Sequence, residues 1–169
     1  IDDGVKSLDE SIEIIKNMKA LGYKKIITTP HIMSHRFPNR KDNILAGCEL
    51  VKNELSKQNI DIELQAAAEY YFDEYFIEKI RDKDLLTFGD NYVLFELSYT
   101  STPFGLEQIV FELLQSGYKP ILAHPERYTY YSSSLEKYAG LKDMGLLFQI
   151  NLNSFHKFYG AKPNLAAEH

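Results

Sequence analysis

Short continuous apolar runs alternate with longer segments of helical periodicity along the whole chain. Leu8, Ile12 and Ile15 recur at helical spacing behind a capping-box pattern that starts at Ser7, and Gly22 ends the pattern. Apolar runs bounded by Gly or Pro are typical of buried strands in parallel sheets. The pattern predicts strands over 24–29, 60–67, 92–97, 119–123 and 146–150, and helices over 8–21, 44–55, 73–82, 103–114 and 134–143, with a further helix beginning near 162. This alternation predicts an α/β fold built on a parallel sheet or barrel.

Two of the predicted strands are near-copies of each other, and each leads into a histidine. Residues 22–31 read GYKKIITTPH, and residues 117–125 read GYKPILAHP. In wound α/β folds the carboxyl ends of the strands face one common crevice, and that edge carries the chemistry. The pattern therefore predicts that His31 and His124 lie at one functional edge of the sheet.

Composition and charge exclude several classes of function. The chain has 169 residues, of which 44% are apolar and 25% charged, and its formal net charge is -5. This acidity argues against a nucleic acid or an anionic membrane as the main partner. The sequence has neither the ~18 consecutive apolar residues of a membrane span nor the residue order of a signal peptide, so we expect a cytoplasmic protein without membrane insertion. The single cysteine, Cys48, excludes an intramolecular disulfide, and its helical context indicates a buried apolar residue.

Four carboxylate or imidazole side chains follow four consecutive predicted strands. His31, Glu69, Glu96 and His124 are separated by 38, 27 and 28 residues, close to the ~30 residues of one βα repeat. Imidazole and carboxylate together are ligands of Zn²⁺, Mn²⁺ or iron, whereas a carboxylate pair without metal could serve acid–base chemistry. Each residue alone could instead be a helix cap, a surface charge or a hydrogen-bonded core group. Glu96 is the sharpest case, because a carboxylate inside a buried apolar run needs a cationic partner.

Two further clusters belong to the same interpretation. Asp2-Asp3-Gly4 could contribute carboxylates to the site or could be only a turn before the first helix. Arg127 lies three residues after His124, where its planar guanidinium could hold a phosphate with two hydrogen bonds. The alternative for Arg127 is a salt bridge with Glu126 or a neighbouring helix. An arginine beside a metal cluster favours phosphoryl chemistry.

Six motifs occur in a fixed order from one end of the chain to the other. They are Asp2-Asp3-Gly4, Thr28-Thr29-Pro30-His31, Ala67-Ala68-Glu69-Tyr70-Tyr71, Leu94-Phe95-Glu96-Leu97, Ala123-His124-Pro125-Glu126-Arg127-Tyr128 and Gln149-Ile150-Asn151. This series resembles the motifs of the polymerase-and-histidinol-phosphatase (PHP) family. Within that family it is most similar to the bacterial capsular-polysaccharide tyrosine phosphatases of the CpsB and YwqE kind.

The resemblance implies a fold, an activity and a set of site residues. The fold is a distorted (β/α)7 barrel, similar to a TIM barrel, that binds up to three divalent ions, commonly Mn²⁺, with Fe or Zn as alternatives. The activity is metal-dependent hydrolysis of phosphotyrosine in a protein, and the implied partner is a cytoplasmic tyrosine kinase of the polysaccharide export machinery. The implied metal ligands are Asp3, His31, Glu69, Glu96 and His124, with Glu69 bridging two ions. Arg127 would bind the phosphate and stabilise its transition state.

The chain also departs from the family pattern. The family begins with a strand that bears His-x-His before the Asp-Asp-Gly turn and ends with a Ser-Asp-x-His strand, and neither motif occurs in this sequence. We therefore expect residues 1–169 to be a single PHP domain that lacks its first and last strands, so that the barrel is incomplete. Exchange of segments with a second copy of the chain is an alternative. Asn151 and Asn153 lie directly after the fifth predicted strand, and we assign no catalytic role to them.

The sequence leaves three functional hypotheses. The first is a protein-tyrosine phosphatase that hydrolyses its substrate with a metal-activated water while Arg127 bears part of the growing charge. The second is another PHP-type phosphoesterase, acting on histidinol phosphate or nucleotides. The third is an inactive fragment or regulatory relative. Tyrosines of the predicted loops could stack on a phenyl ring at the mouth of the site or could pack at the barrel rim. They are Tyr70, Tyr71, Tyr99, Tyr128, Tyr130 and Tyr131.

Overall fold

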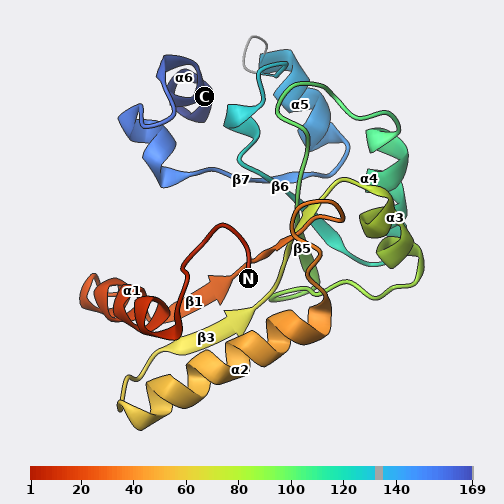
Figure 1. Ribbon diagram of the computed structural model, residues 1–169. Coiled ribbons are helices and arrows are strands. Elements are labelled where there is room, and N and C mark those ends of the chain that lie inside the picture. Colours follow the sequence, from red (N-terminus) through yellow and green to blue (C-terminus); the bar gives the residue numbers. More distant parts are fainter. Residues whose placement is uncertain (132–134, 169) are drawn as a thin grey trace.

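The computed structural model describes residues 1–131 and 135–168, and Figure 1 shows their arrangement. The described residues form the helices α1 (Leu8–Ala20), α2 (Lys41–Lys57), α3 (Glu74–Arg81), α4 (Leu106–Gln115), α5 (Leu135–Asp143) and α6 (Ala161–Glu168). They form the strands β1 (Lys25–Thr28), β2 (His31–Ile32), β3 (Glu63–Ala66), β4 (Glu69–Tyr71), β5 (Tyr92–Glu96), β6 (Lys119–Ala123) and β7 (Leu147–Gln149). Short 3-10 helices follow β6 and β7, namely η1 (Pro125–Arg127) and η2 (Leu152–His156). The molecule has a mixed α/β fold.

All strand pairs of the two described sheets are parallel, as the alternation of strands and helices predicts. β1 pairs with β3, and the other strands form one sheet in the order β2-β4-β5-β6-β7. Because parallel strands share one direction, their carboxyl ends lie along the same edge. The loops that leave this edge therefore bring together residues that are far apart in the sequence.

Two of the predicted strands are each followed by a second short strand, and these second strands carry site residues. His31 pairs with Glu69 at the same register offset that relates β1 to β3. The Ala67 amide donates a 2.8 Å hydrogen bond to the Thr28 carbonyl, and the Glu69 amide donates one of 3.1 Å to the Pro30 carbonyl. His31 and Glu69 therefore follow β1 and β3, as the sequence predicts. Each also begins a further short strand, β2 or β4, in the same register.

Side-chain caps fix the starts of two helices. The Ser7 hydroxyl accepts a 3.1 Å hydrogen bond from the Glu10 amide at the start of α1, as its capping-box pattern predicts. The Asp73 carboxylate accepts a 3.0 Å hydrogen bond from the Phe76 amide at the start of α3. Each carboxylate or hydroxyl satisfies an amide that has no partner within its own helix.

The start of α4 differs from the prediction. The sequence places Pro103 in the first turn of this helix, whereas the helix begins at Leu106. Gly105 precedes it with a φ of 79°, a left-handed conformation that an L side chain rarely adopts. The backbone turn at Gly105, rather than Pro103, sets the direction in which α4 leaves the preceding loop. The predicted helix over 134–143 agrees with α5, and residue 134 lies outside the described residues.

The core lies between the parallel sheet and the helices that pack against it. Figure 1 shows α2 running beside β3, and α3 and α4 lying next to each other. The Phe76 ring of α3 stacks on Tyr70 of β4 and Phe95 of β5, with ring centroids 5.1 Å and 5.6 Å apart. All three side chains are almost fully buried. Their large buried area ties α3 to the strands that carry Glu69 and Glu96.

Cys48 lies on α2 and is buried as a free thiol, which confirms the expectation of an apolar core residue. None of the helices in the described part of the chain is long and apolar enough to cross a membrane.

Candidate metal and phosphate site

The structure brings together the four side chains that the strand pattern singled out. The Nε2 atom of His124 lies 3.0 Å from Oε1 of Glu69 and 3.6 Å from Oε2 of Glu96. The Nε2 atom of His31 lies 3.9 Å from the other oxygen of Glu96. Glu96 thus lies between the two histidines. β2, β4 and β5 supply His31, Glu69 and Glu96, and His124 directly follows β6. The histidines of the two near-copies in the sequence are therefore both next to Glu96.

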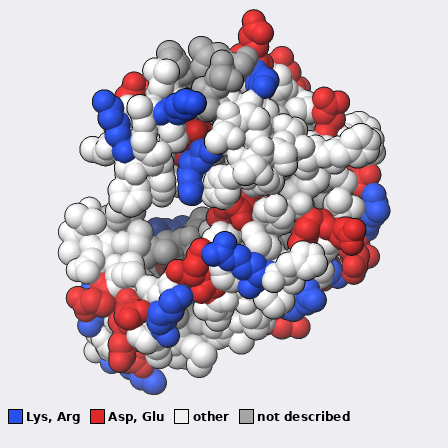
Figure 2. All heavy atoms as spheres, turned by 45° about the horizontal axis from the view of Figure 1, so that its top comes forward, with Lys and Arg blue, Asp and Glu red and all other residues white. Residues whose placement is uncertain are grey.

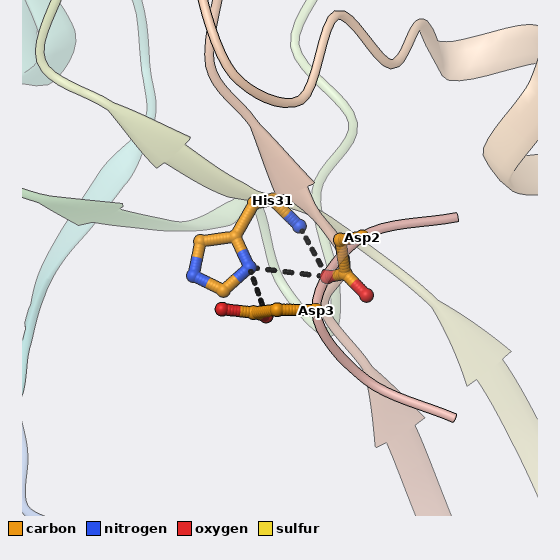
Figure 3. Close-up of side chains that lie close together, drawn as sticks. All are labelled: Asp2, Asp3 and His31. Carbon is orange, nitrogen blue, oxygen red and sulfur yellow. Dashed lines mark hydrogen bonds and ion pairs between the residues drawn. The ribbon is translucent and has the colours of Figure 1, made fainter. Parts of the chain in front are cut away.

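Asp2 and Asp3 approach His31 from the opposite side of its ring, as Figure 3 shows. The Nδ1 atom of His31 lies 3.0 Å from Oδ2 of Asp2 and 3.5 Å from Oδ1 of Asp3. The His31 amide also donates a 3.0 Å hydrogen bond to the same oxygen of Asp2. Asp3 is therefore placed beside the cluster, and the Asp2-Asp3-Gly4 segment is more than a turn.

Sequence reasoning missed the role of Asp2. Its carboxylate holds both the backbone and the ring of His31, and its other oxygen accepts a 3.0 Å hydrogen bond from the Gly4 amide. A carboxylate on one ring nitrogen fixes the orientation of a histidine and leaves the other nitrogen for a ligand. The doubled aspartate was the only available signal, and no local pattern tells which of two adjacent carboxylates contacts a residue 29 positions away.

Burial and neighbouring charges shift the pKa values of Glu96 and His31. Burial raises the pKa of Glu96, the charge of Glu69 raises it further, and the two histidines and Arg127 act in the opposite direction. Burial would lower the pKa of His31, but its hydrogen bond to Asp2 and the charges of Glu69 and Glu96 raise it overall. Two neighbouring carboxylates in a buried place need positive charge nearby.

Two groups of side chains have the geometry of a cation site. In each group the candidate ligand atoms lie within 4.8 Å of one another. One group consists of Asp2, Asp3 and His31, and the other of His31, Glu69 and Glu96. Oxygen and imidazole nitrogen suit Mn²⁺, iron or Zn²⁺. The donor set and its excess of negative charge therefore fit divalent ions.

His124 occupies a strained position directly after β6. Its φ of 35° and ψ of 52° lie in the left-handed region, which is uncommon for a residue with a side chain. Within the described residues, its buried Nδ1 atom has no hydrogen-bond partner. The strained backbone turns the chain from β6 directly into η1, and this turn brings Arg127 to the site. Strain at such a position is a recurrent feature of functional sites.

The Arg127 guanidinium lies between two aromatic rings. Its Cζ atom is 4.8 Å from the ring centroid of Tyr99 and 4.3 Å from that of Tyr159. Within the described residues Glu126 does not pair with it; Oε1 of Glu126 accepts hydrogen bonds from the Asn151 amide at 3.1 Å and the Ser154 hydroxyl at 2.7 Å. Stacking contacts leave the in-plane N–H donors of Arg127 free, and the described residues contain no carboxylate paired with it. The salt-bridge alternative for Arg127 is wrong.

The site residues line a cleft with a volume of about 640 Å³. Figure 2 shows that this face of the molecule is hollowed, with acidic and basic side chains at the border of the hollow. Residues that line the cleft include Asp3, His31, Glu69, Glu96, His124, Arg127, Tyr71, Tyr99, Arg36 and Asn151. Arg36 is the member of this set that sequence reasoning missed, because it lies in an exposed loop without any motif. Asn153 is exposed and does not line the cleft.

The tyrosines of the predicted loops divide into two groups. Tyr71 and Tyr99 line the cleft. Tyr70 and Tyr128 are almost fully buried, and their hydroxyls accept hydrogen bonds from backbone amides. Burial, together with the charge of Glu96, raises the pKa of Tyr99 to about 12, so its phenol stays protonated at neutral pH. An aromatic wall for a phenyl ring can therefore come from Tyr71, because the Tyr99 ring already stacks on His124 and lies against the Arg127 guanidinium, whereas Tyr70 and Tyr128 hold the scaffold.

The comparison with protein families decides where the chain belongs. The family model described as capsular polysaccharide synthesis, CpsB/CapC, matches residues 1–167. The chain belongs to the CpsB/CapC family. Its relatives include the tyrosine-protein phosphatase CpsB of Streptococcus agalactiae, which is 28% identical over 152 residues, covering 89% of this chain and 63% of the relative. CpsB of Streptococcus pneumoniae is 29% identical over 167 residues, covering 96% of the chain and 68% of the relative.

A more distant relative and a solved structure extend the comparison. The tyrosine-protein phosphatase YwqE of Bacillus subtilis is 26% identical over 161 residues, covering 95% of the chain and 63% of YwqE. The crystal structures of Bacillus subtilis YwqE and Streptococcus pneumoniae CpsB, described as metal-dependent tyrosine phosphatases, match with a TM-score of 0.87 at 24% identity, over 99% of this chain and 68% of the other. This likeness shows that the CpsB/CapC fold is shared. The chain spans about 63% of the length of several of these relatives.

Proposed function

We propose that the protein is a metal-dependent protein-tyrosine phosphatase that hydrolyses phosphotyrosine in the control of capsular or exopolysaccharide synthesis. The observation that carries this proposal is the geometry of the cleft, where two histidines and two glutamates meet beside an arginine that pairs with no carboxylate among the described residues. The names of the relatives support it, since CpsB and YwqE are tyrosine-protein phosphatases.

We assign the metal ligands to Asp3, His31, Glu69, Glu96 and His124, with Glu69 bridging. The proposed ions are Mn²⁺, up to three, with Fe or Zn as alternatives. The short distances between these side chains and the excess negative charge of their carboxylates support this set. When bound, such ions lower the pKa of a water molecule towards neutrality and supply a nucleophile.

The other side chains of the cleft have separate roles in the proposed reaction. Arg127 binds two oxygens of the phosphoryl group through its fork of N–H donors and offsets the charge that grows on them. Asp2 keeps the His31 ring in place through the bond to Nδ1. Tyr71 provides aromatic surface against which the phenyl ring of the substrate can lie. Because the cleft is open to solvent, a phosphotyrosine side chain can reach the cluster.

We further propose that residues 1–169 form one domain and correspond to part of a distorted (β/α)7 barrel. Parallel pairing through all described strands supports this proposal. β1 and β7 also support it, because each has one edge that pairs with no other strand within the described sheets. The substrate would be a phosphotyrosine protein, for which a tyrosine kinase of the polysaccharide export machinery is the proposed identity. The family description, capsular polysaccharide synthesis, supports that context. A cytoplasmic location would fit such a partner.

The test uses the complete gene product, loaded with Mn²⁺ and assayed with a phosphotyrosine peptide, a phosphoserine peptide, histidinol phosphate and p-nitrophenyl phosphate. We expect turnover of the phosphotyrosine peptide and a loss of kcat of about 100-fold in Arg127→Ala, the size typical for one lost donor to a transition-state charge. Arg81→Ala on α3 is the matched control, because it removes the same charge from an exposed ion pair with Glu112.

Two results would contradict the proposal. A preference for histidinol phosphate would favour the second hypothesis from the sequence, a different PHP-type phosphoesterase. Fewer than about two ions per molecule by elemental analysis, with no turnover of any substrate, would favour the inactive or regulatory relative. Unchanged kcat in Arg127→Ala with the metal content preserved would refute the role of Arg127 alone.

A further inference from the structure

Arg36 forms a stack over the first histidine of the site. Its Cζ atom lies 5.0 Å from the ring centroid of Phe37, and the Phe37 ring lies 5.3 Å from the ring of His31. The Phe37 ring therefore contacts both the Arg36 guanidinium and the His31 ring. Arg36 lines the same cleft as the metal cluster and comes from the loop between β2 and α2.

A similar arrangement of arginine and aromatic ring lies over the second histidine, with the rings closer to parallel. The Tyr99 ring stacks on His124 with centroids 5.6 Å apart, and the Arg127 guanidinium lies over the same Tyr99 ring. The two histidines end the two near-copies in the sequence, so the cleft has one cationic stack beside each copy. Arg127 is half-buried, whereas Arg36 is exposed at the rim.

The loop that carries Arg36 is held in one conformation. The Met33 and Phe37 backbones exchange two hydrogen bonds of 2.9 Å, which close a tight loop around residues 34–36. The Ser34 amide donates a 3.0 Å hydrogen bond to the Asp73 carboxylate at the start of α3. An arginine on a fixed loop loses less conformational entropy on binding than one on a free segment.

The guanidinium of Arg36 has no carboxylate partner in the described part of the chain. Its contact with the face of Phe37 leaves the planar N–H fork open to a ligand among the described residues. The chain carries a net charge of -5, so an acidic substrate would otherwise be repelled. A positive group at the rim offsets this repulsion locally.

We propose that Arg36 is a specificity-determining residue that binds a carboxylate side chain next to the phosphorylated tyrosine of the substrate. The inference rests on the proposed phosphotyrosine phosphatase function and adds a preference for acidic residues around the target tyrosine. Arg127 binds the phosphoryl group at the cluster, and Arg36 binds the flanking acid at the rim. Arginine and carboxylate form paired hydrogen bonds of good geometry, which suits this recognition.

The test compares two peptides that carry the same phosphotyrosine, one flanked by glutamates and the other by glutamines. We expect the Mn²⁺-loaded complete gene product to prefer the glutamate peptide through a lower KM. In Arg36→Gln this preference falls by about fivefold, the size of one exposed charge pair with hydrogen bonds. Arg81→Gln, which removes the same charge far from the cleft, leaves the preference unchanged. Arg36→Lys retains part of the preference, because it keeps the charge without the planar fork.

The outcomes separate this inference from the proposed function. If both peptides are hydrolysed and Arg36→Gln changes their KM values equally, the inference is overturned while the phosphatase function stands. If neither peptide is hydrolysed, the same pair is made with a non-hydrolysable phosphonate in place of the phosphate and titrated by calorimetry. Loss of the glutamate preference in Arg36→Gln then supports the inference, and equal binding of both peptides overturns it.

Discussion

Replacing Tyr159 by leucine tests whether aromatic faces position the proposed phosphate-binding arginine. Arg127 has a ring on each face, with Tyr159 at 4.3 Å and Tyr99 at 4.8 Å from its Cζ atom. Tyr159 lies in the segment after η2, more than thirty positions from Arg127, and does not reach the His–Glu cluster in the described contacts. Its removal should therefore act through Arg127 alone.

The magnitude follows from the strength of one cation–π contact. Such a contact contributes about 0.5–1 kcal/mol at exposed sites and about 2 kcal/mol when shielded from water. Tyr159 is half-buried, so we take about 1 kcal/mol. If that free energy holds the guanidinium in the orientation that binds the transition state, kcat falls by about fivefold. Tyr159→Phe keeps the ring and should retain activity to within about twofold.

The assay is hydrolysis of p-nitrophenyl phosphate and of a phosphotyrosine peptide by the Mn²⁺-loaded complete gene product, with kcat and KM determined separately. Phe155→Leu is the matched control, because it removes an exposed ring from the neighbouring η2, and within the described residues Phe155 makes no ring contact with Arg127. Metal content and thermal unfolding establish that each variant is loaded and folded. Equal kcat values for Tyr159→Leu and Tyr159→Phe would refute the reasoning, since only one of them lacks the ring.

Two further predictions concern the scaffold and the ions. Tyr128→Phe should lower the free energy of unfolding by about 2 kcal/mol in urea, because its buried hydroxyl accepts from the Leu97 amide at 2.9 Å and donates to the Ala123 carbonyl at 3.0 Å. An equal loss in Tyr23→Phe, at an exposed tyrosine, would contradict this account. Mn²⁺ at about 100 times its Kd should stabilise the folded protein by about 2.7 kcal/mol in thermal unfolding, and Glu96→Gln should abolish most of that shift. A full shift in Glu96→Gln would argue against Glu96 as a ligand.

Local pattern was sufficient to predict the elements on which the site is built. Apolar runs bounded by Gly or Pro gave β5, β6 and β7 nearly to the residue, because a buried parallel strand must be apolar on both faces. The same rule made Glu96 stand out, since a carboxylate inside such a run requires a specific partner. The start of α4 was wrong, because a left-handed Gly105 sets it instead of Pro103.

Contacts between distant segments could not be predicted in this way. The short strands β2 and β4, which begin at His31 and Glu69, depend on pairing between two distant segments, which neither segment signals alone. The bond from Asp2 to His31 and the stacking of Tyr159 on Arg127 join residues without any shared periodicity. Such contacts are set by how the sheet curves and where the chain returns.

The sequence by itself determined the parallel α/β order and singled out His31, Glu69, Glu96 and His124 at one edge of the sheet, because burial and strand direction follow from local composition. The tertiary structure alone decided which groups meet: Glu96 between His31 and His124, and Arg127 held by aromatic faces with its donors free. It also placed Arg36 at the rim of the same cleft. The physical reason is that side-chain distances across a sheet depend on register, bends and packing, and these are properties of the whole fold.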